Sequence, residues 1–218
     1  MKVVVLTLRA PLSSWSEGGV TYRPTDMVPT WSALVGLIGA AFGWARDDNR
    51  LVELAREYAP AVKVEKNGER IVDYHTVQTP HAPSLGNIAP LTRLDELERG
   101  RKVDGMVHTN ITRREYVCDA AYAVAIFPTG PTPTPAAGEI VEALRNPVFP
   151  LYLGRKSCTP THIEATVIEA AKVEDALDAT HWDARLTTKL SATAARERRD
   201  QLLSVSPRSF GLRRECVR

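Results

Sequence analysis

The stretch Lys2–Leu8 constrains the fold most strongly, because it is an apolar and β-branched run with no alternation of polar and apolar residues. A strand of this kind is typical of a sheet interior. The sequence therefore predicts a buried central strand at the N-terminus. With 218 residues, of which 44% are hydrophobic, the chain can bury a core of its own. Since only 6% of the residues are aromatic, we expect that core to consist of Val, Leu, Ile and Ala.

A helix is expected over Thr30–Trp44, after a polar loop rich in Ser, Gly and Pro. This helix contains Gly36, Gly39 and Gly43, and a glycine costs a helix interior about 0.5–1 kcal/mol relative to alanine. Their spacing of three and four places them on one helix face. Two interpretations stay open: this face packs tightly on the chain's own sheet, or it lets a second polymer approach closely.

The remaining pattern predicts further strands and helices. Two strands joined at Asn67-Gly68 have the signature of a hairpin. A buried strand is expected over Glu115–Phe127, a helix that stops at Asn146-Pro147, and a strand over Thr166–Lys172. The stretch between residues 75 and 114 has little periodicity, apart from a short helix capped by Thr92. Residues 201–218 are expected to form a hairpin with a basic tail.

The order strand, helix, two strands, insertion, strand, helix, strand predicts an α+β fold with a ferredoxin-like layout. We expect one domain over residues 1–218, with an insertion at residues 76–114 and a C-terminal β-rich extension at residues 163–218.

Composition and the lack of certain motifs limit the kinds of site and the environment that we expect. The net charge of +2 and a pI of about 8.5 are too mild to diagnose nucleic-acid binding, so any basic site must be local. Cys118, Cys158 and Cys216 are widely spaced, which favours reduced thiols. No stretch approaches the roughly 20 apolar residues of a membrane span. We therefore expect a cytoplasmic protein with no membrane contact. Histidines without ligand spacing and the lack of cofactor motifs predict no metal and no cofactor.

Short basic pairs recur at predicted strand ends and turns, namely Arg113-Arg114, Arg155-Lys156 and Arg213-Arg214. They are either solvated edges or parts of a surface that follows phosphates. The start of the glycine helix is a second candidate, because Thr30 or Ser32 can cap it and its N–H groups favour a phosphate. Arg23 lies a few residues upstream, where it can add a charge-assisted contact.

Several stretches together resemble the Cas-five family, the CasD subunits of type I-E CRISPR Cascade complexes. The most specific are "RPT…PT…GLIG" and "PLYLGRKSC". They lie within six stretches, in the family's order: "VLTLRAPLSSW", "YRPTDMVPTWSALVGLIGAAFGWARDD", "DYHTVQT", "TRREYVCDAAYAVAI", "NPVFPLYLGRKSC" and "PRSFGLRRE". Residues 80–108 and 172–204 do not match, so nothing is inferred for them from the family.

The resemblance implies a modified RNA-recognition fold, which is ferredoxin-like, with the insertion as a protruding thumb. It implies a non-catalytic subunit that holds the 5′ handle of the CRISPR RNA. The expected partners are a CasC-type backbone subunit, a CasA-type large subunit and, through the complex, target DNA. Relatives in type I-C systems cut the precursor RNA themselves. A metal-independent endoribonuclease is therefore the alternative, with Tyr74 and His75 as acid–base candidates; otherwise these two are a structural tyrosine and a polar histidine at a strand end.

The candidate RNA contacts follow from residue chemistry and from position within the matching stretches. At the helix start they are Arg23, Thr25, Thr30 and Ser32; at the thumb base they are Tyr74, His75, Arg113 and Arg114; Arg155 and Lys156 add contacts to the RNA backbone. Trp15 either stacks on a base or anchors its loop in the core. No catalytic and no metal-binding residue is expected in a subunit of this kind.

Overall fold

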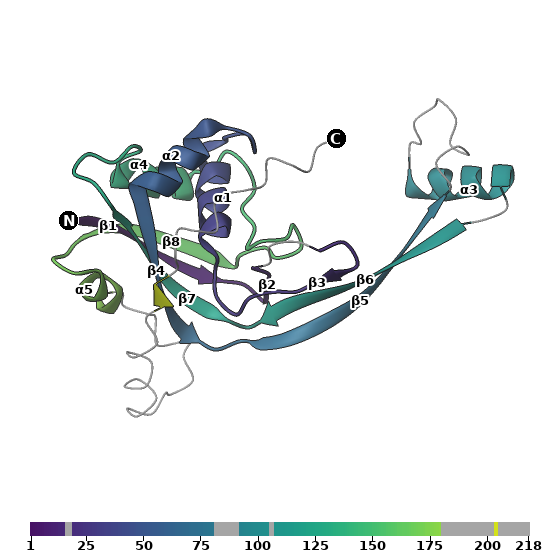
Figure 1. The fold of residues 1–218 in the computed structure, drawn as a ribbon, viewed down its shortest axis with the longest axis horizontal. Helices are drawn as coiled ribbons and strands as arrows, with labels where there is room; N and C mark the ends of the chain where they lie inside the picture. The colour runs from purple at the N-terminus through teal and green to yellow at the C-terminus, as the bar shows by residue number, and fades with distance from the viewer. Residues whose placement is uncertain (16–18, 81–91, 105–106, 180–202, 205–218) are drawn as a thin grey trace. The chain divides into compact units, whose positions relative to one another are not determined.

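The chain folds into two compact units in the computed structural model (Figure 1). The structure describes residues 1–15, 19–80, 92–104, 107–179 and 203–204. The main unit comprises Met1–Ser16, Thr25–Ile71 and Tyr116–Arg218, and the second unit comprises Glu17–Pro24 and Val72–Glu115.

The expected basic tail with Arg213-Arg214, and Cys216, lie outside the described residues. Cys118 and Cys158 are free thiols. No helix in the described residues is long and apolar enough to cross a membrane.

A five-stranded sheet forms the centre of the main unit, in the order β8-β1-β7-β4-β9. Its neighbouring strands are antiparallel throughout. The strands are β1 (Lys2–Arg9), β4 (Tyr58–Lys66), β7 (Ala121–Pro128), β8 (His162–Glu169) and β9 (Leu203–Ser204). Val5 of β1 pairs with Ala125 on one side and with Thr166 on the other. The predicted central position of the N-terminal strand is therefore confirmed.

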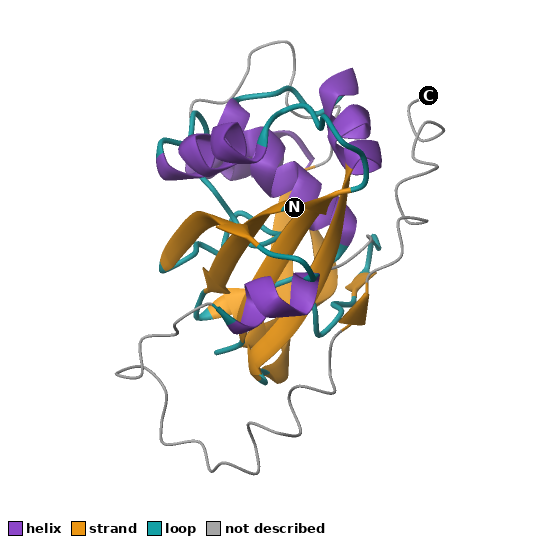
Figure 2. Ribbon diagram, turned by 90° about the vertical axis from the view of Figure 1, so that its left-hand side faces the viewer, coloured by secondary structure: helices purple, strands orange, loops and turns teal. Residues whose placement is uncertain are grey.

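The side chains of β1 pack alternately into two cores, which explains why its sequence lacks polar alternation. Val4, Leu6 and Leu8 belong to the larger core. Val3 and Val5 belong to a smaller one, which α5 (Val173–Asp178) covers with Ala176 and Leu177. Figure 2 shows helices on both sides of the sheet. Burial on both faces explains why the buried positions Val3–Leu6 and Leu8 are all apolar.

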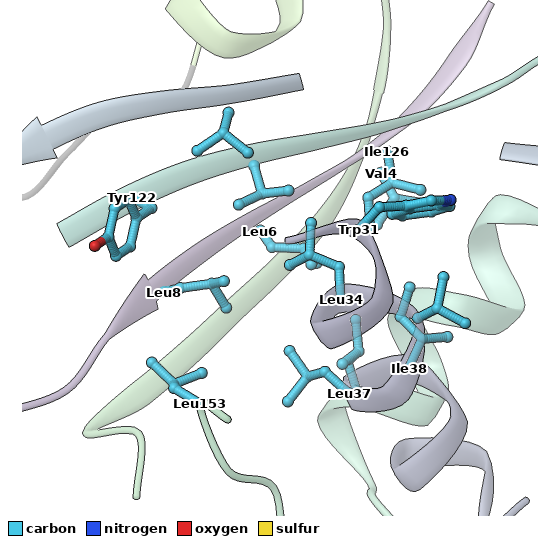
Figure 3. Packing of buried hydrophobic residues seen from close by; sticks show 14 of the residues in the cluster. Val4, Leu6, Leu8, Trp31, Leu34, Leu37, Ile38, Tyr122, Ile126 and Leu153 are labelled. Carbon is cyan, nitrogen blue, oxygen red and sulfur yellow. The ribbon is translucent and has the colours of Figure 1, made fainter. Parts of the chain in front are cut away.

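Three helices cover the face with the larger core: α1 (Trp31–Phe42), α2 (Asn49–Glu57) and α4 (Ala137–Arg145). The buried side of α1 presents Trp31, Leu34, Leu37 and Ile38 toward β1 (Figure 3). The Trp31 indole N–H also donates to the Ala55 carbonyl of α2 at 3.3 Å. Burying a side chain of this size contributes about 1.5–3 kcal/mol, so this face fixes the position of α1 and of its N-terminus.

Helix α1 ends two residues before the predicted end, because Gly43 is its C-cap and not an interior residue. Gly43 adopts φ 75° and donates its N–H to Ala40, and Trp44 donates to Gly39, as expected of a glycine cap. An ideal Cβ on Gly39 would lie 2.3 Å from the Leu51 side chain of α2. Of the two interpretations of this face, packing within the chain therefore explains Gly39, although its neighbour is a helix and not the sheet.

The hairpin predicted at Asn67-Gly68 is wrong, although both of its strands form. Strand β4 pairs with β7 and β9, and β5 (Glu69–Pro80) pairs with β6 (Val107–Cys118). An ideal Cβ on Gly68 would lie 2.5 Å from the Cys118 carbonyl oxygen. The connection thus packs against the end of β6. The turn does not form a hairpin, because β5 pairs with β6 and not with β4.

The single strand predicted over Glu115–Phe127 is also wrong, because Asp119 interrupts it. Asp119 has φ 53°, a left-handed conformation that Asp tolerates better than most residues. The chain therefore turns between β6 and β7. Strand β2 (Leu12–Ser13) pairs with β6 just before this turn.

The second unit contains most of β5 and β6, the short strand β3 (Tyr22–Arg23) and helix α3 (Arg93–Asp104). Thr92 Oγ1 accepts the Asp95 N–H at 3.1 Å. The predicted cap of this helix is thus confirmed. Likewise, α4 ends at the predicted stop, with Asn146 as its C-cap.

Candidate nucleic-acid interface

The N-terminus of α1 carries the hydroxyls that the sequence singled out. Thr30 has extended backbone angles, φ −79° and ψ 153°, and its Oγ1 accepts the Ala33 N–H at 3.4 Å. Ser32 Oγ lies 3.3 Å from Thr30 Oγ1. Of the two cap candidates, Thr30 is the cap. The first turn has no acidic residue, so no carboxylate of the helix competes with an anion at these N–H groups.

Thr25 and Trp15 hold the preceding loop to the core. Thr25 is 4% exposed, and its Oγ1 accepts the Trp15 N–H at 2.8 Å and donates to the Asp26 carbonyl at 3.0 Å. Trp15 is 2% exposed, and its ring meets the Tyr122 ring edge-on with centroids 5.8 Å apart. Trp15 thus takes the core position of the two arrangements considered.

Tyr122 completes this anchor. Its hydroxyl accepts the Trp15 indole N–H at 3.4 Å and donates to the Met27 carbonyl at 2.7 Å. Burial raises the pKa of Tyr122, which keeps the hydroxyl protonated and able to donate. The loop that leads into α1 is therefore fixed by a buried hydrogen-bonded chain from Thr25 to Met27.

The turn Leu153–Cys158 is closed on itself and fastened to the segment around Ser14. Leu153 donates to the Cys158 carbonyl at 2.8 Å, and Ser14 donates to the Leu153 carbonyl at 3.0 Å. Gly154 has φ 96°, and an ideal Cβ on it would lie 1.7 Å from the Ser14 carbonyl oxygen. Only glycine fits there. Burial raises the pKa of the Cys158 thiol, so Cys158 acts as a small buried side chain.

This turn presents its two basic residues differently. The Arg155 guanidinium carbon lies 4.7 Å from the centroid of the Tyr116 ring, within the range of a cation–π contact. Lys156 is exposed. The structure thus brings the "SSW" and "GRKSC" stretches together, with Arg155 oriented by an aromatic ring and Lys156 directed at solvent.

In the second unit, the register of a two-residue strand joins two arginines from separate stretches. Strand β3 pairs in parallel with β6, with Tyr22 opposite Arg113 and Arg23 opposite Arg114. The Arg113 N–H donates to the Thr21 carbonyl at 2.8 Å. The sequence grouped Arg23 with the helix start, whereas this register sets it beside Arg114.

Two residues of this strand pair were missed in the sequence, Tyr22 and Glu115. The Tyr22 hydroxyl donates to the Glu115 carboxylate, and Glu115 is 5% exposed. A buried carboxylate requires such partners. The available signal was their position next to the basic residues, in "YR" and in "RRE". Ser14, which the Leu153–Cys158 turn contacts, gave no such signal.

Tyr74 and His75 do not converge on one point. They are successive residues of β5, so their side chains extend to opposite faces of the strand. Tyr74 is 57% exposed, and His75 is half-buried. This arrangement does not form an acid–base pair around a single substrate.

The described residues form an α/β protein with an antiparallel central sheet, and arginines lie on the β3–β6 strand pair and in the Leu153–Cys158 turn. The family comparison identifies the class: the model of the CRISPR-associated protein family Cas5 (Cas_Cas5) matches residues 3–215. The chain belongs to this family, and the resemblance noted in its sequence is confirmed.

One relative by sequence and one solved structure agree with the family. The CRISPR system Cascade subunit CasD of Escherichia coli (strain K12) is 35% identical over 163 residues, which cover 73% of this chain and 67% of that protein. A chain of a solved CRISPR RNA-guided surveillance complex is 30% identical with a TM-score of 0.53, over 72% of this chain and 59% of that chain. The chain thus spans less than two thirds of its counterpart in that complex. A further crystal structure of a Cas protein is 28% identical with a TM-score of 0.48, over 73% of this chain and 60% of the other.

Proposed function

We propose that this protein is a non-catalytic, RNA-binding subunit of a type I-E CRISPR Cascade complex that holds the 5′ handle of the CRISPR RNA. The observation that carries the proposal is the 35% identity to a Cascade subunit over 67% of that subunit's length. The proposed neighbours are a CasC-type backbone subunit and a CasA-type large subunit, with target DNA reached through the complex.

The strand order supports the ferredoxin-like part of the proposal. In chain order, β1, β4, β7 and β8 are the four strands of a βαββαβ layout, and they lie in the order fourth, first, third, second. The helices α1 and α4 occupy the two crossovers. The second unit interrupts the layout between β4 and β7, where we place the thumb. Because β8 belongs to the central sheet, we take the C-terminal extension to begin after Glu169.

We assign the RNA contacts by exposure and chemistry. The α1 cap with Thr30 and Ser32, the Lys156 turn, and the arginines of β3 and β6 are proposed to bind backbone phosphates. A charge-assisted contact of this kind contributes about 1.5–3 kcal/mol. We propose that Thr25 and Trp15 support the interface from within, since their polar atoms already bond to the loop and the core.

The proposal is tested by co-expressing the chain with the other Cascade subunits and a CRISPR RNA, then crosslinking the purified complex. We expect crosslinks from this chain to the nucleotides at the 5′ end of the RNA. Lys156→Gln should lower the salt dependence of RNA binding by about 0.7 in log–log slope, the value for one phosphate of a single strand. The matched control is Arg46→Gln, an exposed residue after α1, which should leave the slope unchanged. A complex whose RNA 5′ end crosslinks only to other subunits would contradict the proposal.

Cleavage is tested on the same material. The full-length chain, incubated with repeat RNA in EDTA, should leave the RNA intact. Specific cleavage that disappears in His75→Ala would instead support the endoribonuclease alternative, which the geometry of Tyr74 and His75 does not favour.

A further inference from the structure

We propose that Arg23 and Arg114 form a clamp for a single phosphate, and that the clamp exists only while β3 keeps its parallel register with β6. The proposal rests on the proposed function, because the phosphate is taken to be a phosphodiester of the bound RNA. It goes further by assigning two residues from distant parts of the sequence to the same phosphate, and by naming the residues that position them.

The register places both guanidinium groups on one face of the strand pair. Arg23 is opposite Arg114, and Tyr22 is opposite Arg113. In paired strands, side chains at opposed positions share a face and successive residues alternate between faces.

Two side-chain contacts agree with this assignment of faces. The Arg114 Nε donates to Thr112 Oγ1 at 3.1 Å, two residues away along β6. On the opposite face, the Tyr22 hydroxyl donates to Glu115, two residues from Arg113. Each contact joins side chains on the same face, as the register requires.

The two faces carry different side chains. The face with Tyr22 and Arg113 also carries Glu115, whose carboxylate accepts the Tyr22 hydroxyl. On the other face, Arg23 and Arg114 are opposed, with Thr112 two residues from Arg114 along β6. Like charges at opposed strand positions destabilise a sheet, and an oxyanion between them reverses the sign of that interaction. Two neighbouring guanidinium groups present forked donors that match phosphate oxygens.

Backbone and side-chain contacts both hold the register. Strand β3 has two residues and is held by the hydrogen bond from Arg113 to Thr21 and by the Tyr22–Glu115 contact. The turn that leads into it requires glycine, because Gly19 has φ 145° and an ideal Cβ on it would lie 1.9 Å from the Tyr22 carbonyl oxygen. Tyr22 is therefore a positioning residue: it contacts no phosphate but sets the register of Arg23.

The test is a double-variant cycle on the full-length chain in its Cascade complex, with affinity for 5′-handle RNA measured over a range of salt concentrations. Arg23→Gln and Arg114→Gln should each weaken binding about tenfold. The double variant should be scarcely weaker than either single variant, and its salt slope should fall by about 0.7, the value for one phosphate. Arg23→Gln with Arg113→Gln is the matched control from the opposite face, and its effects should multiply.

A hundredfold loss in the Arg23→Gln/Arg114→Gln variant, with a slope loss near 1.4, means two separate phosphates and overturns the clamp. Unchanged affinity in both single variants also overturns it. Tyr22→Phe removes no charge. If Tyr22 sets the register, this variant should lower affinity several-fold and abolish the coupling between the two arginines; if coupling persists in Tyr22→Phe, the positioning role is wrong.

A second measurement separates failure of the clamp from failure of the proposed function. If the wild-type complex binds no handle RNA, the proposed function fails, and thermal unfolding of the full-length chain in inorganic phosphate decides the clamp. Phosphate should then raise the Tm of the wild type and of Arg46→Gln, at matched ionic strength, but not that of the Arg23→Gln/Arg114→Gln variant. Equal phosphate responses in all three proteins would overturn the clamp.

Discussion

Replacing Gly36 of α1 by alanine should stabilise the protein. An ideal Cβ on Gly36 meets nothing within 4 Å, and the residue is exposed. The substitution therefore adds no clash, removes backbone freedom from the unfolded chain and improves helix propensity. We expect the free energy of unfolding to rise by about 0.5–1 kcal/mol. For a chain of this length, this corresponds to an increase in Tm of roughly 1–4 °C.

Gly39→Ala is the matched control in the same helix, because the gain in propensity is the same and only the surroundings differ. Its Cβ would lie 2.3 Å from Leu51 Cδ2. The leucine tip must move, and overpacking of this kind costs about 1–3 kcal/mol. The difference between the two variants isolates this packing cost, since propensity cancels. Urea titration measures the change in the free energy of unfolding of each variant, provided that the m-value stays unchanged.

A loss of stability in Gly36→Ala would refute the reasoning, because it would mean that the added methyl group meets other atoms on this face of α1. A further variant, Gly36→Leu, tests whether a second polymer approaches there. It should fold normally and assemble poorly with the other Cascade subunits and RNA. Normal assembly of a stable Gly36→Leu protein would remove the close-approach hypothesis from this residue.

Three other substitutions test the anchors of the main unit. Gly154→Ala should lower the free energy of unfolding by at least about 2 kcal/mol in denaturant titration, because it adds strain at positive φ to a Cβ 1.7 Å from a backbone oxygen. Thr25→Val should cost about 1–3 kcal/mol, since it leaves the buried Trp15 N–H without its acceptor. Burial, with smaller contributions from nearby carboxylates, raises the pKa of Tyr58 to about 12 from 10.0. Its neutral form therefore stabilises the fold fully below pH 10, and this contribution is lost as the pH rises toward 12. Tyr58→Phe, which loses the hydrogen bond to Pro135, should flatten that part of the stability profile.

The elements with strong local signals were predictable from the sequence. The apolar, β-branched run of β1, the Thr92 cap of α3 and the Asn146 stop of α4 each depend on residues within a few positions of one another. The hairpin at Asn67-Gly68 failed for a different reason. A turn signal reports that the chain changes direction, but it does not name the partner of either strand, and β5 pairs with a segment beyond the insertion.

The candidate site also has one part that the sequence predicts and one part that only the structure reveals. The chemistry of Arg23, Arg114 and Lys156 is visible in the sequence, as is the cap at Thr30. The pairing of Arg23 with Arg114 is not, because a two-residue strand has no periodicity and its partner lies about 90 residues away. Tyr22 and Glu115 were missed because their role depends entirely on that register.

The stretches that identify the family combine two kinds of residue, and the structure separates them. Gly154 lies in a matching stretch where a Cβ would clash with the Ser14 carbonyl oxygen, and Thr25 lies in one where its hydroxyl accepts the buried Trp15 N–H. Arg23, Arg114 and Lys156 lie in the same stretches, yet they have at least partly exposed side chains. Changes to the first pair should therefore lower stability in the absence of RNA. Changes to the basic residues should leave unfolding nearly unchanged and reduce salt-dependent RNA binding. Within one motif of this chain, the glycines and buried hydroxyls therefore indicate the fold. The charged side chains of the same motif indicate binding.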